Sequence, residues 1–177
     1  MNKVTKITLI FLLVFGAVLA EIRLVPEVYG GPHGIQLAIN DANDGDIISV
    51  WLMNVEPDTY DFIDFQGKSI TVVNRSYFEY NPNYPPSPDY ICIDGYQVNT
   101  VVNMVSGNGT AVLRGFTIQN GQGKNQYDGG GVTLLNWRGT YPNVAYIVEN
   151  KIINNITPAS GGGIRCDNSK GVISGNL

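Results

Sequence analysis

The chain has 177 residues, a length typical of one domain, and a formal net charge of -4 with only 15% charged residues. A nucleic-acid partner requires a basic face, so this charge and the lack of any basic cluster in the sequence exclude nucleic acid as an expected ligand. The composition is rich in Gly, Asn, Val, Ile and Tyr, which predicts many short strands joined by tight turns.

The first twenty residues have the pattern of an export signal. Lys3 and Lys6 precede an apolar run at residues 7–19, and small or apolar residues stand just before Glu21. This pattern predicts a secretory signal peptide at residues 1–20 and a mature domain at residues 21–177. The run is shorter than the roughly 20 residues of a spanning helix, so we expect a secreted or cell-surface protein without membrane insertion after signal cleavage.

A single helix is predicted ahead of the strands. Residues 24–29 are expected to be extended, and residues 34–42 follow a helical period whose apolar face consists of Ile35, Ala38, Ile39 and Ala42. Residues 43–46 end this helix, because Gly45 suits a left-handed position after a helix. One amphipathic helix before a run of strands predicts a cap over the apolar end of a stacked core.

Short apolar segments predict strands along the rest of the chain. They cover residues 47–52, 60–65, 69–73, 91–93, 101–105, 111–118, 132–135, 145–148, 151–153 and 164–166. Residues 75–90 interrupt them with four prolines and five aromatic residues, and this proline density excludes a central strand. We expect that segment to be a surface loop, with further loops at residues 121–128 and 136–143.

The strands recur with a period. A triple glycine before a β-branched residue occurs at residues 129–132 and again at 161–164, and Leu113 and Ile118 stand 34 residues before Ile147 and Ile152. A shorter interval of 25 residues aligns Ile147 with Val172. Such recurrence predicts a repeat protein in which each strand pairs with its equivalent about 4.8 Å away.

Asparagines are expected at the corners between these strands. Asn tolerates the left-handed backbone region and bonds to neighbouring backbone, so stacked asparagines can form a side-chain ladder. The candidates are Asn120, Asn150, Asn154 and Asn155.

From Gly34 onward the chain resembles secreted bacterial right-handed parallel β-helix repeat proteins of the pectate-lyase-like superfamily. The stretches that carry the resemblance are GIQLAINDANDGDIISV, PDTYDFIDFQGKSITVV, the IDG at residues 93–95, AVLRGFTIQNG, GGGV and GGGI. Asp58 departs from it, standing where the family usually has glycine. The resemblance implies an all-β fold, a right-handed parallel β-helix (solenoid) with a short N-terminal capping helix. The chain ends in mid-coil at Leu177, so we expect an N-terminal fragment.

Catalysis is not predicted on this segment. One such scaffold carries lyases, hydrolases, epimerases and adhesins, so the resemblance indicates a fold and not an activity. A polysaccharide lyase needs a basic residue, for which Arg114 and Arg165 are candidates, and calcium held by carboxylates, but Asp128 and Asp167 are isolated in the sequence. A hydrolase needs paired carboxylates, and its family signatures are absent. The alternative is a lyase or hydrolase whose catalytic residues lie beyond Leu177.

Other candidate groups have simpler explanations. The only histidine, His33, precedes the helix and is interpreted as a loop residue. Residues 41–46 resemble a calcium loop but lack its sixth-position glycine and twelfth-position glutamate, so we interpret them as a helix end and turn. We expect no metal and no cofactor, with Ca²⁺ relevant only to a lyase.

The best candidate for binding is a set of aromatic residues in the loops. They are Tyr77, Phe78, Tyr80, Tyr84 and Tyr90, which Trp137 and Tyr141 extend from a neighbouring coil. Aromatic rings among prolines stack on sugars or anchor a protein partner. The other reading is that the loop folds back and packs on the wall of the domain. We therefore expect a non-catalytic module that binds a polysaccharide or a surface protein through its loops.

Two cysteines, Cys92 and Cys166, lie in apolar segments. The export signal permits a disulfide between them. The favoured interpretation is two buried small hydrophobic side chains.

Overall fold

The computed structural model describes residues 19–52, 58–77, 79, 83, 85–124, 128–158 and 160–177. The predicted signal peptide lies almost wholly outside the described residues. Within the described ranges, no helix is both long and apolar enough to cross a membrane.

The described chain contains one α-helix, two short 3₁₀ helices and fourteen short strands. They are β1 (Ile22–Val25), α1 (Gly34–Asp41), β2 (Ile47–Val50), β3 (Asp58–Asp61), β4 (Ile63–Asp64), β5 (Thr71–Asn74), η1 (Arg75–Tyr77), η2 (Pro88–Tyr90), β6 (Ile91–Asp94), β7 (Val102–Val105), β8 (Ala111–Arg114), β9 (Thr117–Gln119), β10 (Val132–Leu135), β11 (Ala145–Val148), β12 (Lys151–Ile153), β13 (Ile164–Asp167) and β14 (Gly171–Ser174).

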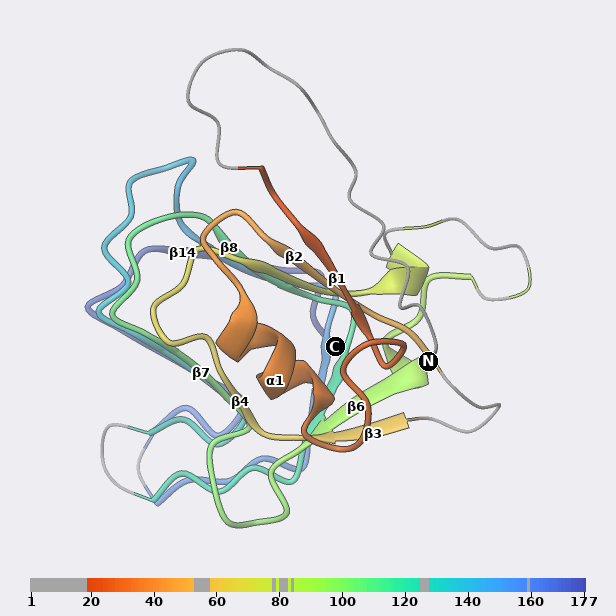
Figure 1. Ribbon diagram of the computed structural model, residues 1–177. Helices are drawn as coiled ribbons and strands as arrows, with labels where there is room; N and C mark the ends of the chain where they lie inside the picture. Colours follow the sequence, from red (N-terminus) through yellow and green to blue (C-terminus); the bar gives the residue numbers. More distant parts are fainter. Residues whose placement is uncertain are drawn as a thin grey trace.

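All strands belong to three parallel sheets. Sheet A has the order β1-β2-β5-β8-β11-β14, sheet B the order β12-β9-β6-β3, and sheet C the order β13-β10-β7-β4. From β2 onward the chain visits A, B and C in turn, and we call one such passage a circuit. Each strand therefore pairs with the equivalent strand of the next circuit, and the sheets enclose a common interior (Figure 1). The fold is mostly β, with parallel sheets and one short helix.

Apolar side chains form columns inside the sheets. In sheet A, Ile48 pairs with Val72, Val72 with Leu113, and Leu113 with Ile147, and all four are fully buried. Burying such a side chain contributes about 1.5–3 kcal/mol relative to leaving it exposed. Because every circuit adds one residue to each column, the hydrophobic core extends with the number of circuits.

The predicted register is confirmed between one pair of successive circuits, in sheets A and B, and wrong between the next pair. Leu113 pairs with Ile147 and Ile118 with Ile152, as predicted. Ile147, however, pairs with Ile173 and not with Val172, so the interval is 26 residues and not 25. A shift of one residue places a side chain on the other face of a strand, and both Val172 and Ile173 are apolar enough to fit the pattern.

Two predicted strands are each divided by a corner. The segment 60–65 contains the boundary between β3 and β4 at Phe62, and the segment 111–118 contains the boundary between β8 and β9 at Gly115. Gly115 has a φ of 84°, which glycine adopts without strain. The apolar pattern continues across both corners, which is why the sequence suggested single strands.

Asparagines occupy corners, as predicted. Asn120 and Asn154 follow β9 and β12 in the left-handed region, with φ values of 54°. Asn150 is instead fully buried, and its Nδ2 donates to the backbone oxygen of Leu113 and to Oδ1 of Asn176. Side-chain bonds of this kind link one circuit to the next.

Helix α1 packs on the first circuit. Its buried residues Ile35, Ala38 and Ile39 join the core, and the helix contacts β1 to β4. In Figure 1 it lies inside the outline formed by the three sheets. The helix ends at Asp41 and a turn follows, which agrees with the interpretation of residues 41–46.

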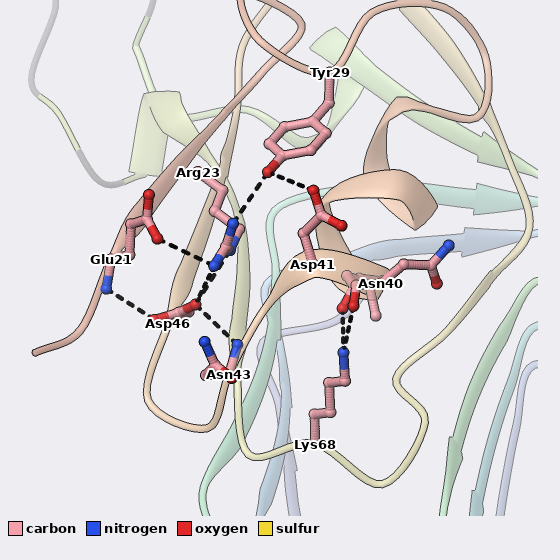
Figure 2. A network of polar contacts seen from close by, with 9 residues as sticks. Glu21, Arg23, Tyr29, Asn40, Asp41, Asn43, Asp46 and Lys68 are labelled. Carbon is pink, nitrogen blue, oxygen red and sulfur yellow. Dashed lines mark hydrogen bonds and ion pairs between the residues drawn. The ribbon is translucent and has the colours of Figure 1, made fainter. Parts of the chain in front are cut away.

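A polar network holds β1 to the turn after α1 (Figure 2). Asp46, only 1% exposed, accepts hydrogen bonds from the backbone N–H groups of Glu21 and Asn43 and from the guanidinium of Arg23. Tyr29 donates to Asp41 and accepts from Arg23, so the strand and the helix are both connected to this network. Burial alone would raise the pKa of Asp46, but these donors together hold it below its ordinary value.

The Asp46 carboxylate should make stability depend on pH. Because its pKa is lower in the folded than in the unfolded state, its contribution is present at neutral pH and is lost as the pH falls through the folded pKa. Replacing Asp46 with Asn leaves the buried Arg23 without its main partner, so we expect a loss of about 3–5 kcal/mol at pH 7. Urea unfolding between neutral and acidic pH measures both effects.

Asp44→Asn is the matched control, because Asp44 is exposed and, among the described residues, accepts a hydrogen bond from the backbone N–H of Ser69 alone. Equal stability losses for the two variants, or an unchanged pH dependence in Asp46→Asn, would contradict the role of the network.

The two cysteines are free and differ in burial. Cys92, on β6, is buried as predicted, and burial followed by the charge of Asp94 raises its pKa to about 12. Cys166 is exposed, so its predicted burial is wrong. It pairs in register with the buried Leu134, but β13 is the last strand of sheet C and no described residue covers it.

This difference predicts selective labelling. A thiol reagent should modify one cysteine per folded chain, Cys166, and two after unfolding in denaturant. Mass spectrometry of the digested protein identifies the labelled residue. Fast labelling of Cys92 in the folded protein would contradict the described core.

Candidate functional site

Tyr77 packs on the outer face of sheet A. Its ring lies against the backbone of Gly115 and under the guanidinium of Arg114, 5.3 Å from the ring centroid. Burial, and after it the charge of Glu149, raises the pKa of Tyr77. The ring is half-buried, so only part of it faces solvent.

The rest of the described loop folds back in the same way. Nδ2 of Asn74 donates to the backbone oxygens of Ser87, at 3.0 Å, and Gly115, at 2.8 Å. Oγ1 of Thr117 donates to the backbone oxygen of Pro88, and Tyr90 is half-buried against the core. These contacts favour the interpretation that the loop packs on the wall. The candidates Phe78, Tyr80 and Tyr84 lie outside the described residues, so their role stays a prediction.

Trp137 and Tyr141 do not form one surface. Trp137 is 0% exposed, its Nε1 donates to the backbone oxygen of Gly109 at 2.9 Å, and its ring lies against Gly107. Its ring therefore offers no face to a ligand, and the structure gives it a packing role. Tyr141 is 79% exposed.

Truncation should separate the two aromatic residues. Trp137→Ala is expected to lower the free energy of unfolding by about 3–5 kcal/mol, because it removes a fully buried ring. Tyr141→Ala, the matched control, should change it by less than about 0.5 kcal/mol. Equilibrium denaturation measures both. A Trp137→Ala protein as stable as its control would show that the ring is not packed as described.

The arginines and the histidine considered for catalysis each contact a carboxylate. Arg114 is paired with Glu149, Arg165 with Asp167, and His33 with Asp61 at the start of α1. In the described part of the chain, no three His, Cys, Asp or Glu residues are grouped so that they could hold a metal ion.

A concavity lies on the loops between sheets B and C. Three loops, after β6, β9 and β12, stack there and line a groove of about 690 Å³. The lining residues are Gln97, Val98, Gln122, Gly123, Lys124, Ile156, Thr157 and Pro158. The groove thus runs across three successive circuits.

Backbone hydrogen bonds join these loops as they join the strands. The N–H of Gln97 donates to Asn120 at 2.7 Å, and the N–H of Gln122 donates to Asn99 at 2.9 Å. Ile156 and Gly123 complete the connection to the third loop, with Gly123 N–H donating to the Ile156 oxygen at 3.0 Å. The groove is therefore preorganised, which lowers the ordering cost of binding.

A tight turn after β6 leads into Val98, which lines the groove. Tyr96 and Gln97 have φ values of 50° and 59°, which non-glycine residues adopt at a cost of order 1–3 kcal/mol each. Asp94 holds the turn, because its carboxylate accepts from the N–H of Tyr96 and from the side chains of Gln119, the last residue of β9, and of Asn120, which follows it. As a result, Tyr96 is 53% and Val98 50% exposed.

The sequence analysis missed this site. It treated Ile93 to Gly95 only as a strand and corner. The available signal was the run Tyr96-Gln97-Val98, in which two non-polar side chains flank an amide directly after a predicted corner.

The groove combines two kinds of surface. The side-chain amides of Gln97 and Gln122 have no hydrogen-bond partner in the described part of the chain, and both residues are exposed. Val98 and Ile156 add exposed aliphatic surface beside them. These two surfaces suit a ligand that has both hydroxyl groups and apolar faces, and the exposed Lys124 adds one positive charge to the lining.

The chain matches no family model, no curated protein and no solved structure. The resemblance to the pectate-lyase-like superfamily therefore rests on the quoted stretches of sequence and on the parallel sheets.

Proposed function

We propose that this chain is a right-handed parallel β-helix with α1 as its N-terminal cap. The repeated order of sheets A, B and C and the buried columns support a solenoid. Its handedness follows the rule that parallel strands joined in one sheet are connected right-handedly in about 98% of cases. The buried face of α1 supports the cap, because it covers apolar residues of the first circuit.

On this scaffold, we propose a secreted or cell-surface module that binds neutral glycans without catalysis. The observation that carries the proposal is the groove between sheets B and C, with its two free amides beside exposed aliphatic side chains. A pyranose ring presents hydroxyl groups at its edge and C–H groups on its faces, so it matches both. Among the described residues that line the groove there is no carboxylate, whereas glycoside hydrolysis needs a pair of them.

The dimensions of the groove support an extended ligand. Its volume falls in the range of about 300–1,000 Å³ typical of ligand sites. Successive circuits lie about 4.8 Å apart, close to the length of one sugar ring, so a chain laid along the stack meets an equivalent loop at each circuit.

The test is binding of the purified protein to a panel of neutral polysaccharides, measured by calorimetry. For a polysaccharide that binds, the double variant Gln97→Ala/Gln122→Ala should weaken affinity about tenfold, because each lost hydrogen bond contributes about 0.5–1.5 kcal/mol. Gln36→Ala is the matched control, since it removes an amide from α1, away from the lining residues. We expect its affinity to stay within about twofold of the original.

A loss of equal size in Gln36→Ala, or none in the double variant, would contradict the groove as the site. Tyr141→Ala distinguishes the other location, because a loss confined to this variant would move binding to the aromatic loops. Binding to no neutral polysaccharide would leave a surface protein as the partner and would overturn the glycan proposal.

A further inference from the structure

Arg138 differs from every other arginine in the chain. Each of the other four forms an ion pair: Arg23 with Asp46, Arg75 with Glu27, Arg114 with Glu149 and Arg165 with Asp167. Arg138 is exposed and has no carboxylate partner in the described ranges. Arg138 therefore lacks a carboxylate partner among the described residues although the chain has a net charge of -4.

A second unpaired cation lies beside it. Lys170 is exposed and, among the described residues, likewise has no ion pair. Lys124 has none among them either but lines the groove between sheets B and C, whereas Lys151 pairs with Asp89 and Lys68 binds two backbone oxygens at the end of α1. Arg138 and Lys170 follow β10 and β13, so they come from the same corner, between sheets C and A, on successive circuits. Together they line a depression of about 570 Å³.

The floor of this depression is rigid. The fully buried Trp137 lies beneath it, and its backbone N–H donates to Oγ of Ser169 at 2.9 Å, while its backbone oxygen accepts from the N–H of Lys170 at 2.9 Å. The N–H of Arg138 donates to Gly107 at 2.8 Å. The backbone at both cations is therefore fixed, and only their side chains remain to engage a ligand.

Nearby polar groups do not neutralise the two cations. The carboxylate closest in sequence, Asp167, is paired with Arg165. Asn168 donates to Oδ1 of Asn136, and the Ser169 hydroxyl donates to backbone oxygens. Neither side chain brings a negative charge to the depression.

We propose that Arg138 and Lys170 form a subsite for an oxyanion, a carboxylate or sulfate, carried by a polysaccharide. Arginine offers a planar fork that matches such groups, and lysine adds a point charge. Two cations are enough to bind a polymer that carries isolated anionic groups. A nucleic-acid binder, by comparison, can contact about 6–10 phosphates. The subsite lies on a different corner from the groove between sheets B and C, so it does not depend on the function proposed above.

Three polymers with one backbone test the proposal: dextran, carboxymethyl dextran and dextran sulfate. At about 0.15 M ionic strength, the purified protein should bind at least one anionic form ten times or more tightly than dextran, roughly 1.4 kcal/mol or more in binding free energy. The double variant Arg138→Ala/Lys170→Ala should lose this preference. The carboxymethyl and sulfate arms distinguish the two anions.

Lys151→Ala is the matched control, because it removes one positive charge and does not line the depression. Its preference should stay within twofold, and Arg138→Lys should keep part of it. Thermal unfolding and far-UV circular dichroism establish that each variant is folded.

Three results would overturn the subsite. They are equal affinity of the original protein for dextran and both anionic forms, equal losses in Lys151→Ala and the double variant, and an unchanged preference in the double variant. A preference for the anionic polymer that survives in Gln97→Ala/Gln122→Ala but is lost in Arg138→Ala/Lys170→Ala would separate this subsite from the groove between sheets B and C.

Discussion

Parallel pairing between successive circuits is the constraint on which the rest of the structure depends. Each strand has only three or four residues in most circuits, which is too short to be stable alone. Its backbone groups find partners only on the strand one circuit away, and this pairing fixes which side chains point inward. The column from Ile48 to Ile147 is a direct consequence of that register.

The same pairing gives the loops their order. Loops that leave equivalent strands start about 4.8 Å apart, so their backbone groups bond to one another and their side chains share a surface. This geometry forms both the groove between sheets B and C and the Arg138–Lys170 depression, which lie on different corners. In each, residues from successive circuits approach one another although they are about 25 to 35 residues apart in sequence.

Polar side chains at the ends and corners satisfy groups that the sheets leave open. Asp46 accepts several hydrogen bonds at the first circuit. The side chain of Asn74 donates to backbone beside the folded-back loop, and that of Asn150 links two later circuits. Buried polar atoms are costly without partners, so each of these residues also fixes a local geometry. The corner that Asp94 stabilises positions Tyr96 in this way.

The sequence by itself determined the elements that depend on local pattern. These include the helix at α1, most of the short strands, the asparagine corners, and the 34-residue register of Leu113 with Ile147, because periodic apolar residues and turn residues act over a few neighbours. It did not determine the register of β14, the burial of Trp137, the exposure of Cys166 or the lack of an ion pair at Arg138 among the described residues. Trp137 is buried by a loop 28 residues away, and Asn74 bonds to a residue 41 positions on. Those contacts, and with them both candidate sites, exist only where the stacking of circuits brings distant segments together.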